Sequence, residues 1–340
     1  KPMATTAADA RSMVAAAKAC EGVLAVVTAA DVQGENQIGA IFPDQPLLVE
    51  DRYRFIGDRL AIVVATNRKL ALRAAARIGV EHRALPVVTD PEAALLPGAE
   101  KIHADGNLIA HQRIRKESRP GDLDATFEGA DLIIEGSWQA PYQEHAYIEP
   151  NGVVAVPGEG DAMTIWASMQ CPWYVQGAIA RVLGVPLAAV RVVQTTTGGA
   201  FGGKEDYPNE PSACAAVAAR LLGRPVKLVF DRHEDMVRST KRHRIRTDLT
   251  FAATKDGQLL GVKATLFVDA GGYAGLSTVV SERANTSAVG PYRVDNASVD
   301  TLVVRTNNLF GGAYRGFGHP QVDFAFESMM DELAARVGVT

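Results

Sequence analysis

The stretch Gly198-Gly199-Ala200-Phe201-Gly202-Gly203-Lys204-Glu205 holds the densest glycine cluster of the chain. A short apolar strand is predicted before it, at Val190–Gln194, and a helix after it, at residues 211–222, which Gly223 ends. Glycines between a strand and a helix let backbone N–H groups approach an anion or a polar ligand closely. The stretch therefore predicts a mixed α/β fold with a ligand-binding turn, although a glycine turn needed only for chain geometry would have the same sequence.

The spacing of this stretch nearly matches a phosphate-binding P-loop, because Gly198, Gly203 and Lys204 stand at the required positions. That motif needs a Ser or Thr hydroxyl after the lysine to bind magnesium. Glu205 stands there instead, and its carboxylate would oppose a triphosphate. The sequence therefore argues against a nucleotide triphosphatase.

The remaining pattern predicts an α+β chain. Thr6 and Asp9 form a predicted capping box for a first helix, and strands at residues 23–28 and 60–65 and an Ala-rich helix at residues 67–78 follow. These elements make a small N-terminal domain at residues 1–90. Residues 91–120 have no periodicity and are predicted to be a connecting segment, and residues 121–340 form a larger mixed α/β domain.

Two further elements are predicted in the larger domain. Asp256-Gly257 lies between apolar runs at residues 248–254 and 259–268, which predicts a hairpin with a type I′ turn. Pro320 starts a final helix with one apolar stripe, formed by Val322, Phe326, Met329, Met330, Leu333 and Val337.

Composition narrows the class of protein. The 340 residues are 47% hydrophobic and 22% charged, with a formal net charge of −4, which is typical of a globular protein and gives no hint of nucleic acid as a partner. The three cysteines, Cys20, Cys171 and Cys214, form no C-x-x-C pair, so neither a disulfide framework nor an iron–sulfur cluster is predicted. No apolar run reaches the roughly 20 residues of a membrane span, and we expect a cytoplasmic protein. Because the chain opens with Lys1 rather than Met, it stays open whether an upstream segment is missing.

Two more segments could bind a ligand. Ala313-Tyr314-Arg315-Gly316-Phe317-Gly318-His319-Pro320-Gln321 places a cation and an aromatic ring just before a helix. In Ser168-Met169-Gln170-Cys171-Pro172-Trp173, Gln170 stands at a strand-to-helix corner, where its amide can donate to an oxo or carbonyl ligand. Taken alone, each has an ordinary explanation: an ion pair for Arg315, core packing for Phe317 and a turn for Gln170.

Together the three segments resemble the molybdenum-domain signatures of the xanthine dehydrogenase family, also called the molybdenum hydroxylases. The resemblance covers about residues 22–340 and includes a small N-terminal, hammerhead-like α/β domain followed by the first half of the molybdopterin-binding domain. The other matching stretches occur in the expected order: residues 57–65, Gly223-Arg224-Pro225-Val226, Ser281-Glu282-Arg283-Ala284, Gly290-Pro291-Tyr292 and Thr306-Asn307. Two positions depart from the family pattern, Ala200 in place of a glycine and His319 in place of a small residue.

The resemblance implies how a cofactor would be held. In this family the molybdenum is bound by a pterin dithiolene and takes no side-chain ligand from the protein, so no direct metal ligand is expected here. Gln170 matches the glutamine that hydrogen-bonds an oxo ligand. Phe201 and Arg315 match positions that contact the cofactor, and Gly199 and Gly202 would let the backbone approach it. Whether the pterin carries a cytosine dinucleotide is left open.

The resemblance also implies a substrate. Glu205 matches the family's purine-facing glutamate, Arg283 the arginine on the opposite side of the substrate, and Phe317 an aromatic that packs against the substrate ring. A fixed guanidinium stabilises negative charge that accumulates on a heterocycle under attack. We therefore expect a purine of the xanthine or hypoxanthine type to be hydroxylated with oxygen from water. The alternatives to a purine hydroxylase are a nicotinate or aldehyde hydroxylase of the same family and a non-catalytic remnant.

The family's molybdenum domain is about twice as long as the part seen here, and its later half supplies the glutamate base. We find no such base in this chain, so we expect activity only with a second molybdopterin subunit or a C-terminal half. The electrons would pass to [2Fe-2S] and FAD groups on partner chains.

Two other patterns are interpreted without a ligand. His145 and Glu149 have the spacing H-x-x-x-E, but no third ligand at suitable spacing supports zinc. The basic run at residues 238–246 is predicted to be a solvated face or an inter-subunit contact.

Overall fold

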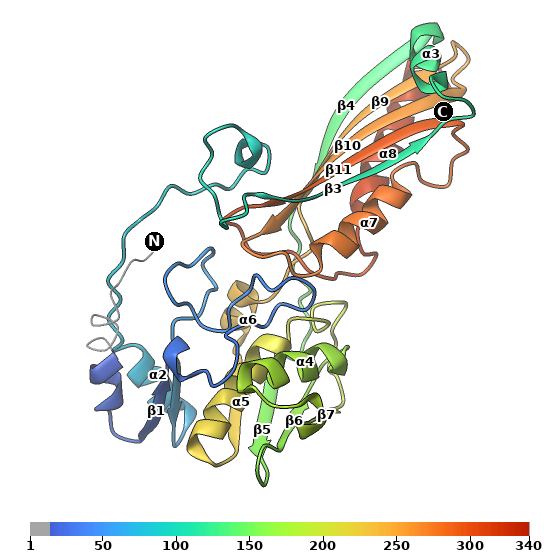
Figure 1. Cartoon of the computed structure of the whole chain (residues 1–340). Coiled ribbons are helices and arrows are strands. Elements are labelled where there is room, and N and C mark those ends of the chain that lie inside the picture. The colour runs from blue at the N-terminus through green and yellow to red at the C-terminus, as the bar shows by residue number, and fades with distance from the viewer. Residues whose placement is uncertain (1–13, 340) are drawn as a thin grey trace. The chain divides into compact units, whose positions relative to one another are not determined.

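The computed structural model describes residues 14–339, which divide into two compact units (Figure 1). Unit 1 is formed by the chain up to Val87, by His145–Thr240 and by Tyr273–Gly275, and unit 2 by Val88–Glu144, Lys241–Gly272 and the chain from Leu276 onward. Each compact unit is thus built from segments that are far apart in the sequence. The capping box predicted at Thr6 and Asp9 lies outside the described residues.

Unit 1 contains a four-stranded sheet in the order β7-β6-β5-β8. The strands are β5 (Gly152–Pro157), β6 (Met163–Ala167), β7 (Val190–Gln194) and β8 (Val226–Val229). The helices α4 (Pro172–Leu183) and α5 (Asn209–Leu222) pack on it, and α6 (Arg232–Arg238) follows β8. Glycines in the left-handed conformation, Gly184 and Gly223, end α4 and α5 as predicted. The Ala-rich α5 is buried along most of its length because small side chains let other elements approach it from every side.

The N-terminal part of unit 1 is the small α/β domain that the sequence predicts. Its strands β1 (Val23–Val27) and β2 (Ile62–Ala65) pair antiparallel, and α2 (Arg68–Ala75) packs against them. The side chain of Asn67 caps α2 by accepting a hydrogen bond from the N–H of Leu70. A short 3-10 helix, η1 (Ala29–Asp31), follows β1, and another, η3 (Leu187–Ala189), precedes β7.

Unit 2 is a five-stranded sheet in the order β3-β11-β10-β9-β4. The strands are β3 (Leu108–Lys116), β4 (Leu132–Ala140), β9 (Ile245–Ala253), β10 (Leu259–Gly271) and β11 (Asn296–Arg305). The β10–β11 pair is parallel and the other pairs are antiparallel. Alternate strand residues form one buried core with α7 (Ser277–Ser287) and α8 (His319–Val337), while α3 (Asp122–Gly129) and η2 (Ala93–Leu95) lie in the connections (Figure 1). The stripe predicted for α8 is confirmed, with Val322, Phe326, Met329 and Leu333 buried.

Two local predictions were wrong. Part of the predicted connecting segment, Leu108–Lys116, is the edge strand β3, whose polar side chains gave no strand signal because one side of it faces solvent. The β9–β10 hairpin has a three-residue loop closed by Thr254 and Gln258 rather than a two-residue type I′ turn. A type I′ turn needs positive φ at both central residues, and here Gly257 has φ of +87° whereas Asp256 does not adopt positive φ.

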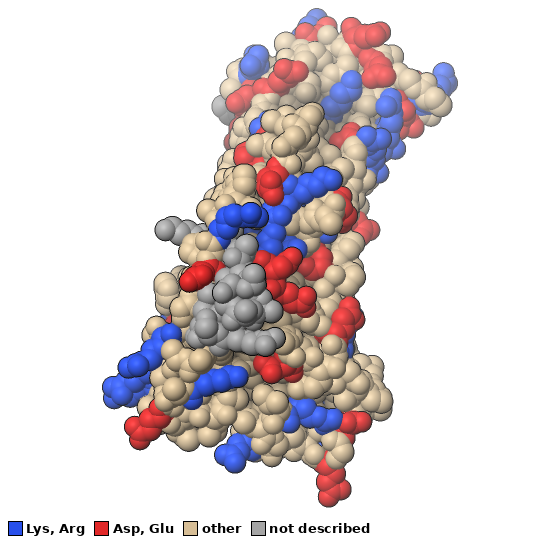
Figure 2. All heavy atoms as spheres, turned by 60° about the vertical axis from the view of Figure 1, so that its left-hand side comes forward, with Lys and Arg blue, Asp and Glu red and all other residues tan. Residues whose placement is uncertain are grey.

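Acidic and basic side chains are interspersed over the face shown in Figure 2, in agreement with the small net charge. Within residues 14–339, no helix is both long enough and apolar enough to span a membrane.

Candidate functional site

The glycine-rich loop at residues 198–205 of unit 1 has an unusual backbone. Gly199 and Gly202 have φ of +96° and +102°, and Phe201 between them also has a positive φ, +54°, which is rare for a residue with a side chain. Phe201 is nevertheless 52% exposed, so core burial does not compensate for the strained conformation. Strain of this kind costs about 1–3 kcal/mol and is concentrated at functional sites. The loop therefore has the kind of strained, exposed backbone that is common at binding sites.

Gln170 is fixed against this loop by its own side chain. Its Oε1 accepts hydrogen bonds from the N–H of Gly202 at 2.9 Å and, more weakly, from that of Lys204 at 3.4 Å, and its N–H donates to the Lys204 carbonyl at 2.7 Å. Because the amide oxygen is taken, Nε2 is left as a donor, and we find no partner for it among residues 14–339. Gln170 is exposed, so a ligand can reach this donor.

The buried side chain of Lys204 holds the loop in place. Its side chain is fully buried, and Nζ lies 2.8 Å from Glu149 Oε2, 3.0 Å from Ser168 Oγ and 4.8 Å from the centre of the Tyr147 ring. Glu149 Oε2 also accepts a hydrogen bond from Gly198 N–H at 2.7 Å. Burial raises the pKa of Glu149, but the hydrogen bonds from Lys204 and Gly198 outweigh it and leave that pKa below its ordinary value. Lys204 and Glu149 thus tie both ends of the loop together.

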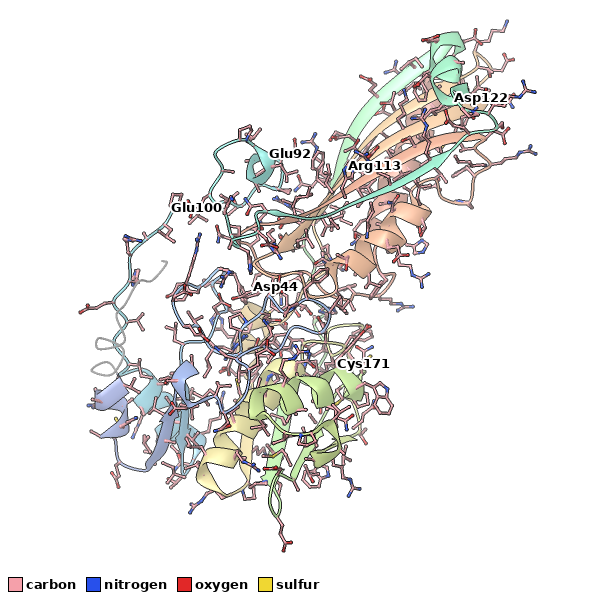
Figure 3. The ribbon with its side chains drawn as sticks, viewed as in Figure 1. Asp44, Glu92, Glu100, Arg113, Asp122 and Cys171 are labelled. Carbon is pink, nitrogen blue, oxygen red and sulfur yellow. The ribbon has the colours of Figure 1, made fainter. Side chains whose placement is uncertain are left out.

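Acidic groups gather after the loop. Glu205 is half-buried, and burial raises the pKa of its carboxyl group. Its neighbour Asp206 is buried, and burial, together with the charge of Glu205, raises the pKa of Asp206 to about 7 although two backbone N–H groups oppose the shift. Cys171, at the start of α4 (Figure 3), and Tyr174 have pKa values raised by burial and by the charges of Glu205 and Asp206. No cation contributes to these four shifts, so this is an anionic cluster.

The second glycine-rich loop, residues 313–321, belongs to unit 2. Phe317 has a positive φ of +50°, between Gly316 and Gly318 with φ of +93° and +99°. Arg315 is exposed, and we find no carboxylate partner for it among residues 14–339. Its guanidinium is therefore available to an anionic ligand.

Arg242 holds this second loop in unit 2. Its guanidinium carbon lies 3.8 Å from the centre of the Tyr314 ring, and the group donates hydrogen bonds to the carbonyl of Arg315 at 2.9 Å and to Gln321 Oε1 at 3.2 Å. The contact combines a cation–π interaction with hydrogen bonds, which an arginine can make together. Arg242 thus contacts the loop on both sides of Phe317, through the Arg315 carbonyl before it and the Gln321 side chain after it.

Arg283 lies on α7 of unit 2 and is exposed, without a carboxylate partner that we find in the described part of the chain. One turn further along, Ser287 Oγ donates to the Arg283 carbonyl at 2.6 Å and lies 3.1 Å from His319 Nε2. His319, a departure from the family pattern, therefore contacts the helix that carries Arg283.

Comparison with known proteins covers both parts of the chain. Residues 102–340 match the molybdopterin cofactor-binding domain, and residues 5–86 match the aldehyde oxidase and xanthine dehydrogenase a/b hammerhead domain. The chain belongs to the aldehyde oxidase and xanthine dehydrogenase family. The resemblance and the fold class predicted from the sequence are thereby confirmed.

Relatives of this family agree over nearly the whole chain. A probable xanthine dehydrogenase subunit of Bacillus subtilis (strain 168) is 37% identical over 323 residues, 95% of this chain and 43% of the relative. The nicotinate dehydrogenase large molybdopterin subunit of Eubacterium barkeri is 37% identical over 323 residues, 95% of this chain and 75% of the relative. The aldehyde oxidoreductase of Desulfovibrio gigas superposes with a TM-score of 0.89 at 31% identity, over 96% of this chain and 37% of that structure. The chain thus spans less than half the length of the first and third of these proteins.

The residues present fit the molybdopterin cofactor of this family. A Cβ atom added at Gly203 would lie 2.7 Å from the ring of His145, and one added at Gly198 would lie 2.6 Å from Glu149 Cβ. The first loop therefore packs tightly against His145 and Glu149. On its other side the loop offers the exposed Phe201 and the free Nε2 donor of Gln170. In unit 2, Arg315 has no carboxylate partner that we find among residues 14–339, and its guanidinium by itself suits a phosphate group.

The structure shows the surroundings of two stretches that were interpreted without a ligand. For most cations of the basic run at residues 238–246 the solvated-face interpretation is wrong, because they have carboxylate partners: Arg238 with Glu210 and Glu234, Lys241 with Glu144, Arg244 with Asp269 and Arg246 with Asp248. Arg242 of the same run packs on Tyr314. The alternative interpretation, an inter-subunit contact, stays a prediction. No group of three or more potential metal ligands occurs in residues 14–339, and His145 packs against Gly203 instead.

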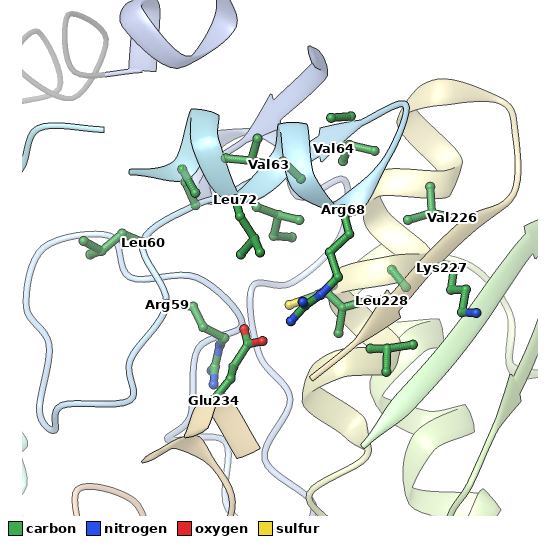
Figure 4. Close-up of a pocket in the computed structure, with 18 of the residues that line it drawn as sticks. Arg59, Leu60, Val63, Val64, Arg68, Leu72, Val226, Lys227, Leu228 and Glu234 are labelled. Carbon is green, nitrogen blue, oxygen red and sulfur yellow. The ribbon is translucent and has the colours of Figure 1, made fainter. Parts of the chain in front are cut away.

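A groove of about 1100 Å³ in unit 1 lies apart from the predicted site residues. It is lined by β2, α2, α5, β8 and α6, and Figure 4 shows Val63, Leu72, Val226 and Leu228 among its apolar walls. None of the residues predicted to contact cofactor or substrate lines it.

Sequence reasoning missed Lys204, Arg242 and Asp206. Lys204 was considered only as a possible P-loop lysine, and Arg242 only as part of a basic run. Their roles depend on partners far away in the sequence, since Lys204 is 55 residues from Glu149 and Arg242 is 73 residues from Arg315. For Asp206, the sequence offered one indication of an acidic pair, namely its position directly after Glu205.

Proposed function

We propose that this chain binds a molybdenum–molybdopterin cofactor and forms part of a hydroxylase that acts on a purine-type N-heterocycle. The observation that carries the proposal is the first glycine-rich loop, in which an exposed, strained Phe201 stands beside a glutamine whose amide oxygen is already occupied. Strained and exposed backbone of this kind is concentrated at functional sites, and a bound cofactor would use it.

Gln170, Phe201 and Arg315, with the backbone at Gly199 and Gly202, would hold the cofactor. The bound cofactor would supply two-electron redox chemistry that amino-acid side chains lack. The chain's own contribution is positioning: Gln170 Nε2 donates to an oxygen ligand, the glycines allow close backbone approach, and the Arg315 guanidinium binds an anionic group. No side chain of this polypeptide is assigned as a metal ligand.

Glu205, Arg283 and Phe317 would bind the substrate. A purine has ring nitrogens that exchange hydrogen bonds with the Glu205 carboxyl group. Arg283 has no carboxylate partner that we find in the described residues, so its charge is available to stabilise negative charge that develops on the ring. Phe317 would orient the flat ring by edge or face contact.

The active assembly would contain further polypeptide. The Bacillus subtilis and Eubacterium barkeri relatives are named as subunits. We propose that another molybdopterin-binding segment supplies the base and that partner chains carry [2Fe-2S] and FAD groups for the electrons. A pterin with or without a cytosine dinucleotide is compatible with this proposal, and the mass of the nucleotide released by acid would distinguish the two.

Nicotinate is the second candidate substrate. It is favoured by the relative from Eubacterium barkeri, of which this chain covers 75% at 37% identity. An aldehyde is the third, because the Desulfovibrio gigas structure superposes so closely. Glu205 favours a purine over an aldehyde, since an aldehyde offers no ring nitrogen to its carboxyl group. It also favours a purine over nicotinate, since an ionised Glu205 would repel the carboxylate of nicotinate.

The test is substrate profiling of the assembled, cofactor-loaded protein with xanthine, hypoxanthine, nicotinate and an aromatic aldehyde, with molybdenum measured in the same sample. The proposal predicts one molybdenum per chain and the highest kcat/KM for a purine. A preference for nicotinate or aldehyde would overturn the purine assignment, and absence of molybdenum and pterin from protein purified from active cells would overturn the enzymatic one.

A further inference from the structure

Asp206 differs from the other buried carboxylates of the described residues. Glu210 pairs with Arg59 and Arg238, Asp235 lies 3.5 Å from Arg232, and Asp269 lies 3.3 Å from Arg244. Asp206 is 6% exposed, has no ion-pair partner in residues 14–339, and its Oδ1 makes no hydrogen bond there. A carboxylate removed from water without a cation is strongly disfavoured, so such a group keeps its proton.

The surroundings of Asp206 add negative charge rather than positive charge. The titratable groups that face it are the adjacent Glu205 and, from α4, Cys171 and Tyr174. The nearest lysine in sequence, Lys204, donates to Glu149 and Ser168 instead. The backbone N–H groups of Asp206 itself and of Tyr207 are the groups that favour its ionised form.

Glu205 and Asp206 therefore form an unequal pair. Glu205 is half-exposed and can hold a charge in contact with water, whereas Asp206 is enclosed. When two carboxyl groups share a site without a cation, the second ionisation is opposed by the first. The pair carries one charge, on Glu205, as long as Asp206 keeps its proton.

We propose that Asp206 is a positioning residue that sets the charge of the substrate side of the site. When Asp206 is protonated, the pair carries the single charge of Glu205. When Asp206 is ionised, the pair carries two charges and the site rejects anionic heterocycles. The inference rests on the proposed role of Glu205 in substrate binding. Loss of the Asp206 proton to solvent changes the charge of the pair from −1 to −2, and no covalent bond between heavy atoms forms or breaks.

The pKa of Asp206, raised by burial to about 7, places this change in the neutral range. Discrimination between a neutral and an anionic heterocycle should therefore depend on pH. Below about pH 7 the pair has one charge and the penalty for an anionic ligand is small. Above it the second charge repels an anion, by roughly three- to tenfold in binding for a like charge at about 4–8 Å in a wet site.

The test uses the assembled protein and two pyridines that differ in charge, nicotinate and nicotinamide, as substrates or as competitive inhibitors of purine turnover. In the wild type, the ratio of the inhibition constants (nicotinate over nicotinamide) should rise roughly three- to tenfold from about pH 6 to about pH 8.5. Asp206→Asn should abolish the rise, and Glu205→Gln should move it to lower pH. A wild-type ratio that does not change with pH, or the same rise in Asp206→Asn, would overturn the proposal.

Urea unfolding gives a readout that does not need activity. Between about pH 4 and pH 7 the folded state keeps a proton on Asp206 that the unfolded state has lost, so the contribution of Asp206 to stability decreases as the pH rises through this window. Asp206→Asn should remove that decrease. Asp58→Asn is the matched control, because Asp58 is a carboxyl group with a pKa raised by burial outside the acidic cluster, and it should leave the pyridine ratio unchanged. If the protein hydroxylates no heterocycle but its stability shows the pH dependence assigned to Asp206, the proposed function fails and the proposed titration of Asp206 is supported. If an active enzyme lacks this pH dependence of stability, Asp206 does not titrate as proposed.

Discussion

Lys204 Nζ lies 2.8 Å from the carboxylate of Glu149, and this ion pair joins two segments that are 55 residues apart in the sequence. Because Glu149 also accepts from the N–H of Gly198, the pair closes the glycine-rich loop, with the strained Phe201 between its ends. The lysine is fully enclosed, so it acts on the shape of the loop and not on solvent or ligand directly.

Lys204→Met should destabilise unit 1 and lower cofactor content. The variant removes the Lys204 donor from Glu149 and Ser168, and loss of a hydrogen bond to a charged group costs about 1.5–3 kcal/mol. The 41% exposure of the Glu149 side chain keeps the effect below that of a fully buried pair. Urea unfolding and molybdenum analysis measure both effects. Lys227→Met, on β8, is the control, and equal molybdenum content in the two variants would contradict the role of Lys204.

Gly198→Ala should disturb the same loop by a different route. The added Cβ would lie 2.6 Å from Glu149 Cβ, so Glu149 must move away from Lys204, at a cost of about 1–3 kcal/mol. Gly177→Ala is the matched control, since in α4 an added Cβ meets nothing within 4 Å and the helix should gain about 0.5–1 kcal/mol. Thermal unfolding of both variants should therefore shift in opposite directions; a shift in the same direction would contradict the packing described.

His243 makes the stability of unit 2 depend on pH. The ring is fully buried, its Nε2 lies 2.8 Å from Ser277 Oγ, and burial with the nearby charge of Arg242 lowers its pKa to about 3. Between about pH 6.5 and pH 3 the unfolded state binds a proton that the folded state does not, so the contribution of His243 to stability falls as the pH falls, by at most about 1.4 kcal/mol per pH unit. His243→Gln should flatten this slope in urea unfolding at about pH 4–7, whereas the exposed His233→Gln should retain it.

Local signals predicted much of the fold. Pro172 and Gly184 bound α4, Gly223 ends α5, and the apolar stripe of α8 is buried, because caps and periodicity act within a few residues. The edge strand β3 was missed because its polar side chains resemble a loop. The hairpin loop was assigned the wrong turn because Asp256-Gly257 suits both geometries.

The candidate site was predicted only in part. The glycine-rich loops and Gln170 could be found because their residue types are unusual where they stand. The groups that shape the loops could not, since Lys204 and Arg242 look like ordinary surface cations until the chain folds. The roles of Glu205, Arg283, Phe317 and the cofactor-binding residues stay predictions, and kinetics must test them.

Arg283 is proposed to stabilise the negative charge that develops on a bound purine. The most direct measurement is the kcat for xanthine or hypoxanthine of Arg283→Met in the assembled protein, with molybdenum measured in the same sample and Arg293→Met, whose side chain is 90% exposed, as control. We predict that Arg283→Met lowers kcat by about 10²–10³ with normal molybdenum content, because the lost interaction strengthens in the transition state. A wild-type kcat in Arg283→Met on every purine tested would contradict this role.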